Sequence, residues 1–205
     1  MGSEMTLVVP IKDTRRGKSR LELPATLRPA LVLALALDTI SAAAQVVSVL
    51  AVVETAADAR ALGTLPGVSV YRTAAPDLNA AIRQGLTRLP PDRPAGVLPG
   101  DLPGLRPATL AAALSRLGPD AGWWAVADKE GVGTTLLAAT RADLIRPAYG
   151  GASFIRHLTV GAAALDLPVS SSLRRDVDLP ADLLGNLGPR SWVLAHAAGL
   201  LATPA

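Results

Sequence analysis

Short apolar runs alternate with longer amphipathic stretches along the chain. Six runs have the length of buried strands and are rich in Val, Leu and Ala: residues 6–10, 46–53, 68–71, 96–98, 123–127 and 134–139. Runs that are apolar throughout are typical of strands covered by helices on both faces. The pattern therefore predicts a sheet buried between two helical layers.

The stretches between these runs predict helices. The expected ranges are 24–43, 56–62, 77–89, 107–117, 151–165, 180–186 and 189–201. In the third of them Leu78, Ile82 and Leu86 recur at the spacing of one helical face. Alternating strands and helices predict an α/β protein: a single-domain, Rossmann-like three-layer α/β/α sandwich with a mainly parallel sheet. We expect the domain to span 6–205, after a short non-native or disordered start at 1–5.

Composition excludes several classes of protein. Half of the 205 residues are hydrophobic, only 3% are aromatic and there is no cysteine. The core is therefore aliphatic, and disulfides, thiolate nucleophiles and Cys-ligated zinc are excluded, which fits a cytoplasmic location. The net charge is only +3 and no basic stripe is interleaved with aromatics, so we expect no nucleic-acid partner. Asp38 and Gln45 interrupt the apolar segment 27–53, which predicts a helix running into a strand and no membrane span.

Cations gather in the loop after the first predicted strand. Lys12, Lys18 and Arg20 lie there, at the carboxyl end of a strand, where open α/β sheets bind ligands. Lys and Arg suit the phosphates of a nucleotide. The loop is not a Walker motif, because the upstream glycine of GxxxxGK[ST] is missing. A solvated basic loop is the alternative.

Acidic residues follow at two places. Asp101 comes just after the strand 96–98, between proline turns, and Asp176 and Asp178 are two apart in an extended segment. Residues two apart in such a segment face the same side. Carboxylates with phosphate oxygens and water are the ligands of magnesium, so these acids predict a Mg²⁺ site. A turn aspartate and helix capping ahead of Pro180 are the alternatives.

Two glycine-containing loops, 131–135 and 149–153, allow close backbone approach to a small anion. Thr135, Gly150 and Ser153 are the candidates there, with His157 one helical turn beyond. Asn79 begins a helix, where it binds nucleotide or caps the helix. No Ser-His-Asp grouping, HExxH or nucleophile elbow is present. A phosphate monoester, already anionic near neutral pH, needs no general base, so nucleotidyl transfer to such a group fits.

The ordered motifs resemble a known family. Segments 9–12 with 17–21, then 76–79, 98–103, 131–137, 150–153 with His157, and 176–178 are similar to the guanylyltransferases of deazaflavin coenzyme F-420 biosynthesis. The resemblance covers about residues 6–201. It implies a GT-A-like nucleotidyltransferase fold and a reaction of GTP with phosphoenolpyruvate or 2-phospho-L-lactate that releases pyrophosphate. It also implies handover of the product to the next transferase of the pathway.

The resemblance assigns roles to single residues. Asp101, Asp176 and Asp178 match the magnesium-binding acids, and Lys12, Lys18 and Arg20 match the loop that binds the nucleotide phosphates. Thr135, Gly150 and Ser153 match positions that bind the acid substrate. We expect Lys18 and Asp101 to be catalytic.

Two departures concern the acid substrate. Ala152 stands where a glycine is expected and Tyr149 where phenylalanine is usual. The pair Thr134-Thr135 resembles the bacterial pattern and favours phosphoenolpyruvate.

Other functions stay open at this point. The same reaction on 2-phospho-L-lactate or 3-phospho-D-glycerate, a nucleotide-sugar glycosyltransferase, and a non-catalytic nucleotide-binding subunit all fit the motifs. The protein is expected to be a monomer or a homodimer.

Overall fold

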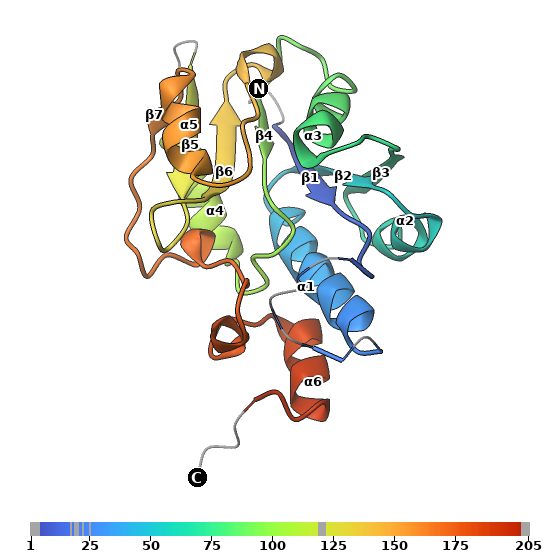
Figure 1. Cartoon of the computed structure of the whole chain (residues 1–205). Helices are drawn as coiled ribbons and strands as arrows, with labels where there is room; N and C mark the ends of the chain where they lie inside the picture. The colour runs from blue at the N-terminus through green and yellow to red at the C-terminus, as the bar shows by residue number, and fades with distance from the viewer. Residues whose placement is uncertain are drawn as a thin grey trace.

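The structure is a computed structural model, and it describes residues 5–16, 18, 21, 23–24, 26–118 and 122–201. Within these residues seven strands form one sheet in the order β3-β2-β1-β4-β6-β5-β7 (Figure 1). Their bounds are β1 Thr6–Ile11, β2 Ser48–Val53, β3 Val68–Arg72, β4 Ala95–Val97, β5 Trp123–Ala127, β6 Thr134–Ala139 and β7 Ala163–Ala164.

The sheet is mainly parallel, as the alternation of elements predicts. β1 pairs in parallel with β2 and with β4, and β3 continues the parallel half beyond β2. β6 is the exception, because it runs antiparallel to both β4 and β5. The short β7 pairs in parallel with β5 at the edge. The carboxyl ends of β1 and β4 therefore lie side by side at one edge of the sheet.

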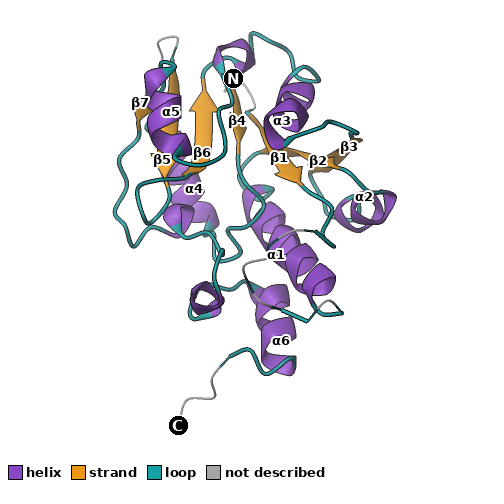
Figure 2. Cartoon of the chain, viewed as in Figure 1, coloured by secondary structure: helices purple, strands orange, loops and turns teal. Residues whose placement is uncertain are grey.

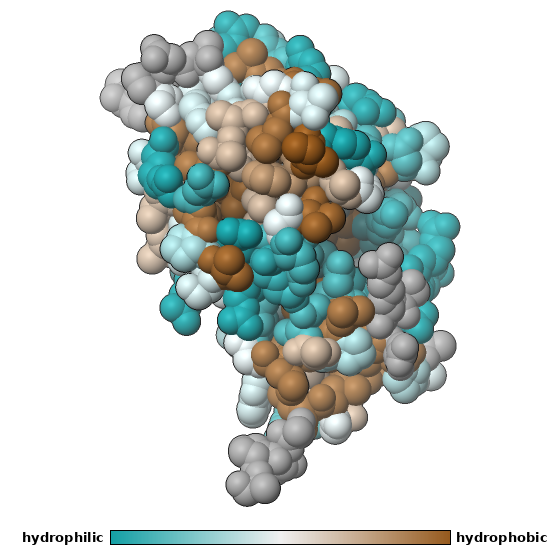
Figure 3. All heavy atoms as spheres, turned by 60° about the vertical axis from the view of Figure 1, so that its left-hand side comes forward, coloured by the Kyte–Doolittle hydropathy of each residue, from teal (hydrophilic) through white to brown (hydrophobic). Residues whose placement is uncertain are grey.

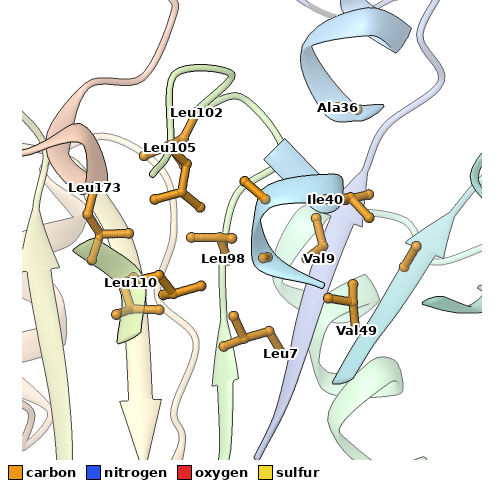
Figure 4. Close-up of a cluster of buried hydrophobic side chains, with 14 of the residues drawn as sticks. Leu7, Val9, Ala36, Ile40, Val49, Leu98, Leu102, Leu105, Leu110 and Leu173 are labelled. Atoms are coloured by element: carbon orange, nitrogen blue, oxygen red, sulfur yellow. The ribbon is translucent and has the colours of Figure 1, made fainter. Parts of the chain in front are cut away.

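Helices cover both faces of the sheet (Figure 2). The α-helices are α1 Arg28–Ala43, α2 Ala56–Leu62, α3 Leu78–Leu86, α4 Pro107–Leu114, α5 Ser153–Thr159 and α6 Pro189–Ala197. Side chains of α1, α2 and α4 pack against one face, and those of α3 and α5 against the other. Figure 4 shows part of the first layer, where Ile40 of α1 lies over Val9 of β1 and Leu98 lies beside them. The aliphatic core is confirmed.

Strands are predicted more closely than helix ends. The ranges 123–127 and 134–139 are those of β5 and β6, and 56–62 is that of α2. The helix predicted at 151–165 is wrong in its second half, because α5 ends at Thr159 and Gly161 takes a φ of 108° before β7. The predicted helix 180–186 is a 3-10 turn, Pro180–Leu183. Helix α1 begins at Arg28, with proline in its first turn, later than the predicted start at 24.

Helix α6 lies below α1 at the lower end of the molecule (Figure 1). The buried carboxylate of Asp38 in α1 accepts hydrogen bonds from the backbone N–H of Arg190 and Ser191, at 3.2 and 2.8 Å. The first turn of α6 is thereby capped from another helix. Its outer face exposes Trp192 and Val193, and Figure 3 shows hydrophobic residues gathered at this lower end.

The prediction that the apolar segment 27–53 forms a helix running into a strand is confirmed by α1 and β2. Asp38, which interrupts this segment, is the residue that holds α6. In the described part of the chain, no helix combines the length and apolarity that crossing a membrane requires.

Candidate active site

The loops after β1 and β4 meet at the carboxyl edge of the sheet, where ligands bind in open α/β folds. Gly100 makes their close approach possible. A Cβ atom on Gly100 would lie 2.1 Å from Cδ1 of Ile11, the last residue of β1. A side chain at this position would require the end of the Ile11 side chain to move, so the glycine allows the close approach that places Asp101 near the β1 loop.

A cavity of about 330 Å³ opens at this point. It is lined by apolar residues of β1, α1 and α3 together with four charged groups and a tyrosine. The lining includes Lys12, Lys18, Asp101, Tyr149 and Asp178. The two loops singled out by their charges therefore share one cavity, as the strand-end rule predicts.

Segment 176–178 joins the cavity through a backbone contact. The N–H of Val177 donates to the carbonyl oxygen of Asp101 at 3.0 Å, and the Val177 side chain is fully buried. The flanking Asp176 and Asp178 consequently turn to the side of Asp101. One carboxylate oxygen from each of the three aspartates lies within 4.8 Å of the others. The three acids therefore lie close together, as the sequence predicts.

Lys18 places its ammonium among these carboxylates. Nζ of Lys18 donates to Oδ2 of Asp101 and, at 2.5 Å, to Oδ1 of Asp178. Burial acts to lower the pKa of Lys18, but the charges of Asp101 and Asp178 outweigh it and hold the pKa well above its ordinary value. Lys18 is therefore a permanent cation, and its backbone adopts a left-handed φ of 52°.

One ammonium does not neutralise three acids. Burial, followed by the charges of Asp101 and Asp178, raises the pKa of Asp176 to about 7, although Lys18 opposes the rise. Asp176 keeps its proton near neutral pH because of burial and the neighbouring negative charges. A further cation that binds beside it would favour loss of that proton.

The residues fit a divalent metal ion. Oδ1 of Asp101 is buried and has no hydrogen-bond partner in the described part of the chain. Buried carboxylate oxygens nearly always have a partner, and a hard cation such as Mg²⁺ takes oxygen ligands of this kind. The three aspartates would hold such an ion, with Asp101 supplying the oxygen that is otherwise unsatisfied.

Two further charged residues support this cluster, and sequence reasoning missed them. Oδ2 of Asp182 accepts from the backbone N–H of Asp178 and Leu179, at 2.9 and 2.7 Å. Its other oxygen accepts from Nζ of Lys129. Asp182 thereby fixes the backbone that carries Asp178. The DxD pattern followed four residues later by another acid was the available signal.

The second glycine loop lies beside the cavity. Gly150 has a φ of 125°, and Ala152 has a φ of 53°, so the loop turns through two left-handed residues. Ser153 is buried and its hydroxyl donates to Thr134 at 3.2 Å. Thr135 is also buried, with its hydroxyl 3.4 Å from the carbonyl oxygen of Ala127. Substrate binding by Thr135, Gly150 and Ser153 stays a prediction.

Asn79 and His157 hold this loop in place. The Asn79 amide donates to the carbonyl oxygen of Tyr149 at 2.9 Å and accepts from its N–H at 2.8 Å. Asp77, not Asn79, caps helix α3, so the capping alternative is wrong. A nucleotide contact of Asn79 stays a prediction, as does that of Lys12. Arg20, also predicted to bind nucleotide, lies outside the described residues.

His157 is fully buried and bonded at both ring nitrogens. Nε2 accepts from the N–H of Ala148 at 2.9 Å, which leaves the proton on Nδ1, 2.9 Å from the hydroxyl of Thr134. Burial, with a contribution from Arg156, lowers the pKa of His157 to about 4. This histidine is a neutral brace for the loop.

Residues 5–185 match the family described as "Guanylyl transferase CofC like". The chain belongs to this family. It is 44% identical over 207 residues to the phosphoenolpyruvate guanylyltransferase of Salinispora arenicola, covering 94% of each chain. With the protein of that name from Thermomonospora curvata it is 39% identical over 203 residues, covering 93% of this chain and 88% of the relative.

Solved structures share the fold of this CofC-like guanylyl transferase family member. A nucleotidyl transferase from Methanothermobacter thermautotroptrophicus matches with a TM-score of 0.58 at 20% identity, covering 89% of this chain and 95% of that one. The 4-diphosphocytidyl-2C-methyl-D-erythritol synthase of Anaerococcus prevotii matches with a TM-score of 0.59 at 11% identity, covering 94% and 99%. The predicted nucleotidyltransferase-type α/β fold is therefore confirmed.

Proposed function

We propose that this chain is a phosphoenolpyruvate guanylyltransferase, which transfers the guanylyl group of GTP to phosphoenolpyruvate and releases pyrophosphate. The product is enolpyruvoyl-2-diphospho-5′-guanosine, an intermediate of coenzyme F-420 biosynthesis. The observation that carries the proposal is the cavity at the carboxyl edge of the sheet, which is lined by a buried lysine, Asp101 and Asp178, with Asp176 converging on the two acids. Family membership and relatives at about 40% identity support the choice of substrates.

The chemistry needs charge neutralisation and alignment. A phosphate oxygen of phosphoenolpyruvate forms a new bond to the α-phosphorus of GTP, while the bond from that phosphorus to the bridging oxygen breaks and pyrophosphate leaves with the electron pair. The attacking phosphate is already anionic near neutral pH, because its second pKa is about 6. The absence of a catalytic histidine or thiol is consistent with this step.

Lys18 and Lys12 line the cavity on the β1 side, where their charges suit the triphosphate. Asp101, Asp176 and Asp178 would hold Mg²⁺, which when bound neutralises charge on the triphosphate and on the departing pyrophosphate. Thr135, Gly150 and Ser153 are proposed to receive the acid. The apolar walls exclude water that would otherwise compete with the attacking phosphate.

The test is an incubation with GTP, magnesium and each of three acids: phosphoenolpyruvate, 2-phospho-L-lactate and 3-phospho-D-glycerate. Pyrophosphate release and the mass of the coupled product are measured together. Phosphoenolpyruvate is expected to give both. A nucleotide-sugar glycosyltransferase or a non-catalytic nucleotide-binding subunit would release no pyrophosphate, and that result with every acid would refute the proposal.

The role of Asp101 has its own test. Asp101→Asn should lower kcat by about a hundredfold or more, because it removes a charged metal ligand, while the melting temperature stays near that of the wild type. Asp166→Asn, at an exposed aspartate away from the cavity, is the control and should keep full activity. Near-normal turnover of Asp101→Asn would remove Asp101 from the reaction.

We further propose a cytoplasmic monomer or homodimer that hands its product to the next transferase of the pathway. Light scattering of the purified protein tests the oligomeric state. Copurification with that transferase, with and without GTP and phosphoenolpyruvate, tests the handover.

A further inference from the structure

The hydroxyl of Tyr149 is buried without a hydrogen-bond partner among the residues that the structure describes. The residue as a whole is only 9% exposed. Buried hydroxyl groups are paired in nearly all proteins, because an unpaired one loses its bonds to water and gains nothing in return. An unpaired hydroxyl in a cavity wall therefore indicates a ligand that supplies the missing partner.

Tyr149 lines the same cavity as Lys18, Asp101 and Asp178. Burial raises the pKa of its hydroxyl well above the ordinary value, and the charge of nearby Asp101 adds to the rise. The group is therefore a protonated donor at any physiological pH. Asp101 lines the same cavity, and its Oδ1 is the other buried side-chain oxygen without a partner in the described part of the chain. Two unsatisfied groups of complementary kind thus belong to residues that line one cavity.

The tyrosine is held rigidly. Its backbone N–H and carbonyl are both bonded to the side-chain amide of Asn79. Its ring meets the buried ring of His157 edge-on, with centroids 4.9 Å apart. A donor fixed in this way loses little conformational entropy when it binds a ligand. Rigid placement is typical of groups that select a substrate.

The position of Tyr149 favours the acid over the nucleotide. The cationic groups, Lys12 and Lys18, line the cavity from the β1 loop, whereas Tyr149 comes from a different loop, the connection between β6 and α5. Gly150 follows it directly in the loop proposed to receive the acid. We propose that the Tyr149 hydroxyl donates a hydrogen bond to an anionic oxygen of the phosphorylated acid and so helps to select that substrate. This inference rests on the proposed guanylyl transfer.

The test compares Tyr149→Phe with the wild type in three measurements. In the ligand-free protein no hydrogen bond is lost, so the melting temperature should be equal or higher. The KM for phosphoenolpyruvate should rise about tenfold to a hundredfold, as expected for loss of a bond to a charged group. The KM for GTP should stay within about twofold, because the nucleotide does not use this hydroxyl.

Tyr71→Phe is the matched control. It removes the hydroxyl of the other tyrosine in the chain, which lies on β3 and accepts from Arg88 at 3.1 Å, away from the cavity. Both of its KM values should be those of the wild type.

Three results would overturn the inference: an unchanged KM for the acid, a rise confined to the KM for GTP, or a clear loss of stability in ligand-free Tyr149→Phe. A wild-type protein that forms no product with any acid would instead refute the proposed function, so the two failures are separable. In that case isothermal titration of both proteins with phosphoenolpyruvate still tests Tyr149, and equal affinities overturn its role.

Discussion

The ammonium of Lys18 lies 2.5 Å from a carboxylate oxygen of Asp178, inside the group of acids that fits a metal ion. It also contacts Asp101, so the lysine ammonium lies beside the same carboxylates that a metal ion would bind. A metal ion held by the three aspartates would therefore compete with Lys18 for the same negative charges in the nucleotide-free protein. Under the proposed function, the phosphates of GTP would offer Lys18 an alternative partner.

This competition predicts opposite effects of one substitution. Lys18→Met should bind Mg²⁺ or Mn²⁺ about tenfold more tightly without nucleotide, which corresponds to about 1.4 kcal/mol, because no ammonium has to be displaced. The same variant should lose most of its turnover. Isothermal titration with the metal alone measures the first effect. Lys12→Met, at the exposed lysine of the cavity wall, is the control for simple loss of charge; if both variants gain affinity equally, the competition is not specific to Lys18.

Asp182 is predicted to act through Asp178. Asp182→Ala removes the acceptor of the Asp178 and Leu179 N–H groups, so the metal ligand is no longer held in position. Metal affinity should fall about tenfold, as for other groups that orient a ligand, whereas KM for phosphoenolpyruvate changes little. Titration of the nucleotide-free protein with Mn²⁺, followed by electron paramagnetic resonance, measures this directly. Asp182→Asn keeps an acceptor oxygen and should recover part of the affinity; an equal loss in both variants would point to the Lys129 ion pair instead.

His157 predicts how stability depends on pH. Its pKa is about 4 in the folded protein against the ordinary 6.5, so between these values the unfolded chain binds a proton that the folded one does not. The contribution of neutral His157 to the free energy of unfolding should therefore be fully present above about pH 6.5. It should decrease by about 2 kcal/mol as the pH falls towards 4, a value that allows for solvent screening of the imidazolium charge. Urea unfolding at several pH values measures the slope.

The matched variants for this slope are substitutions of the two histidines. His157→Gln should be less stable at pH 7 but show a flatter dependence below pH 6.5. His196→Gln, at an exposed position in α6, should keep the wild-type dependence. Equal slopes in all three proteins would mean that the carboxylates alone govern acid unfolding.

Ala152 is strained. Its φ of 53° and ψ of 41° lie in the left-handed region, which costs residues with a Cβ atom about 1 kcal/mol or more. Ala152→Gly should therefore stabilise the protein by about 0.5 to 1 kcal/mol, after the greater backbone entropy of glycine is subtracted. Thermal unfolding measures the gain. Gly150→Ala, at a φ of 125°, should have the opposite sign, and a destabilised Ala152→Gly would show that the loop conformation is not strained.

The left-handed conformation of Ala152 also explains why glycine is expected at this position. Family resemblance leads one to expect glycine just before Ser153, and the structure supplies the physical reason, since glycine reaches this conformation freely. With alanine at this position, Ser153 is the first residue of α5.

Sequence reasoning places the strands well and the helix ends less well. A strand such as β6 is buried along its whole length, so its apolar run coincides with the element. The end of α5 depends on Gly161 and on pairing of β7 with β5, which are tertiary effects. Apolar residues continue through 160–165, so periodicity alone extends the helix too far.

The sequence likewise predicts one part of the candidate site and not the other. Asp101 and the β1 lysines could be predicted to meet because the ends of neighbouring parallel strands share one edge. The hydrogen bond from Val177 to Asp101 joins positions far apart in the chain, and no local pattern encodes it. The Lys129–Asp182 pair was missed for the same reason, since isolated charges in loops are usually solvated.

The bond between Val177 and the Asp101 backbone also orders events during synthesis. Lys18 and Asp101 are translated long before residues 176–178, which follow β6 and α5 in the chain. A chain that has emerged only as far as α5 contains one of the three acids and lacks Asp178 in the cavity wall. The proposed metal site would therefore be complete only after residues 176–178 have been translated and have docked on Asp101.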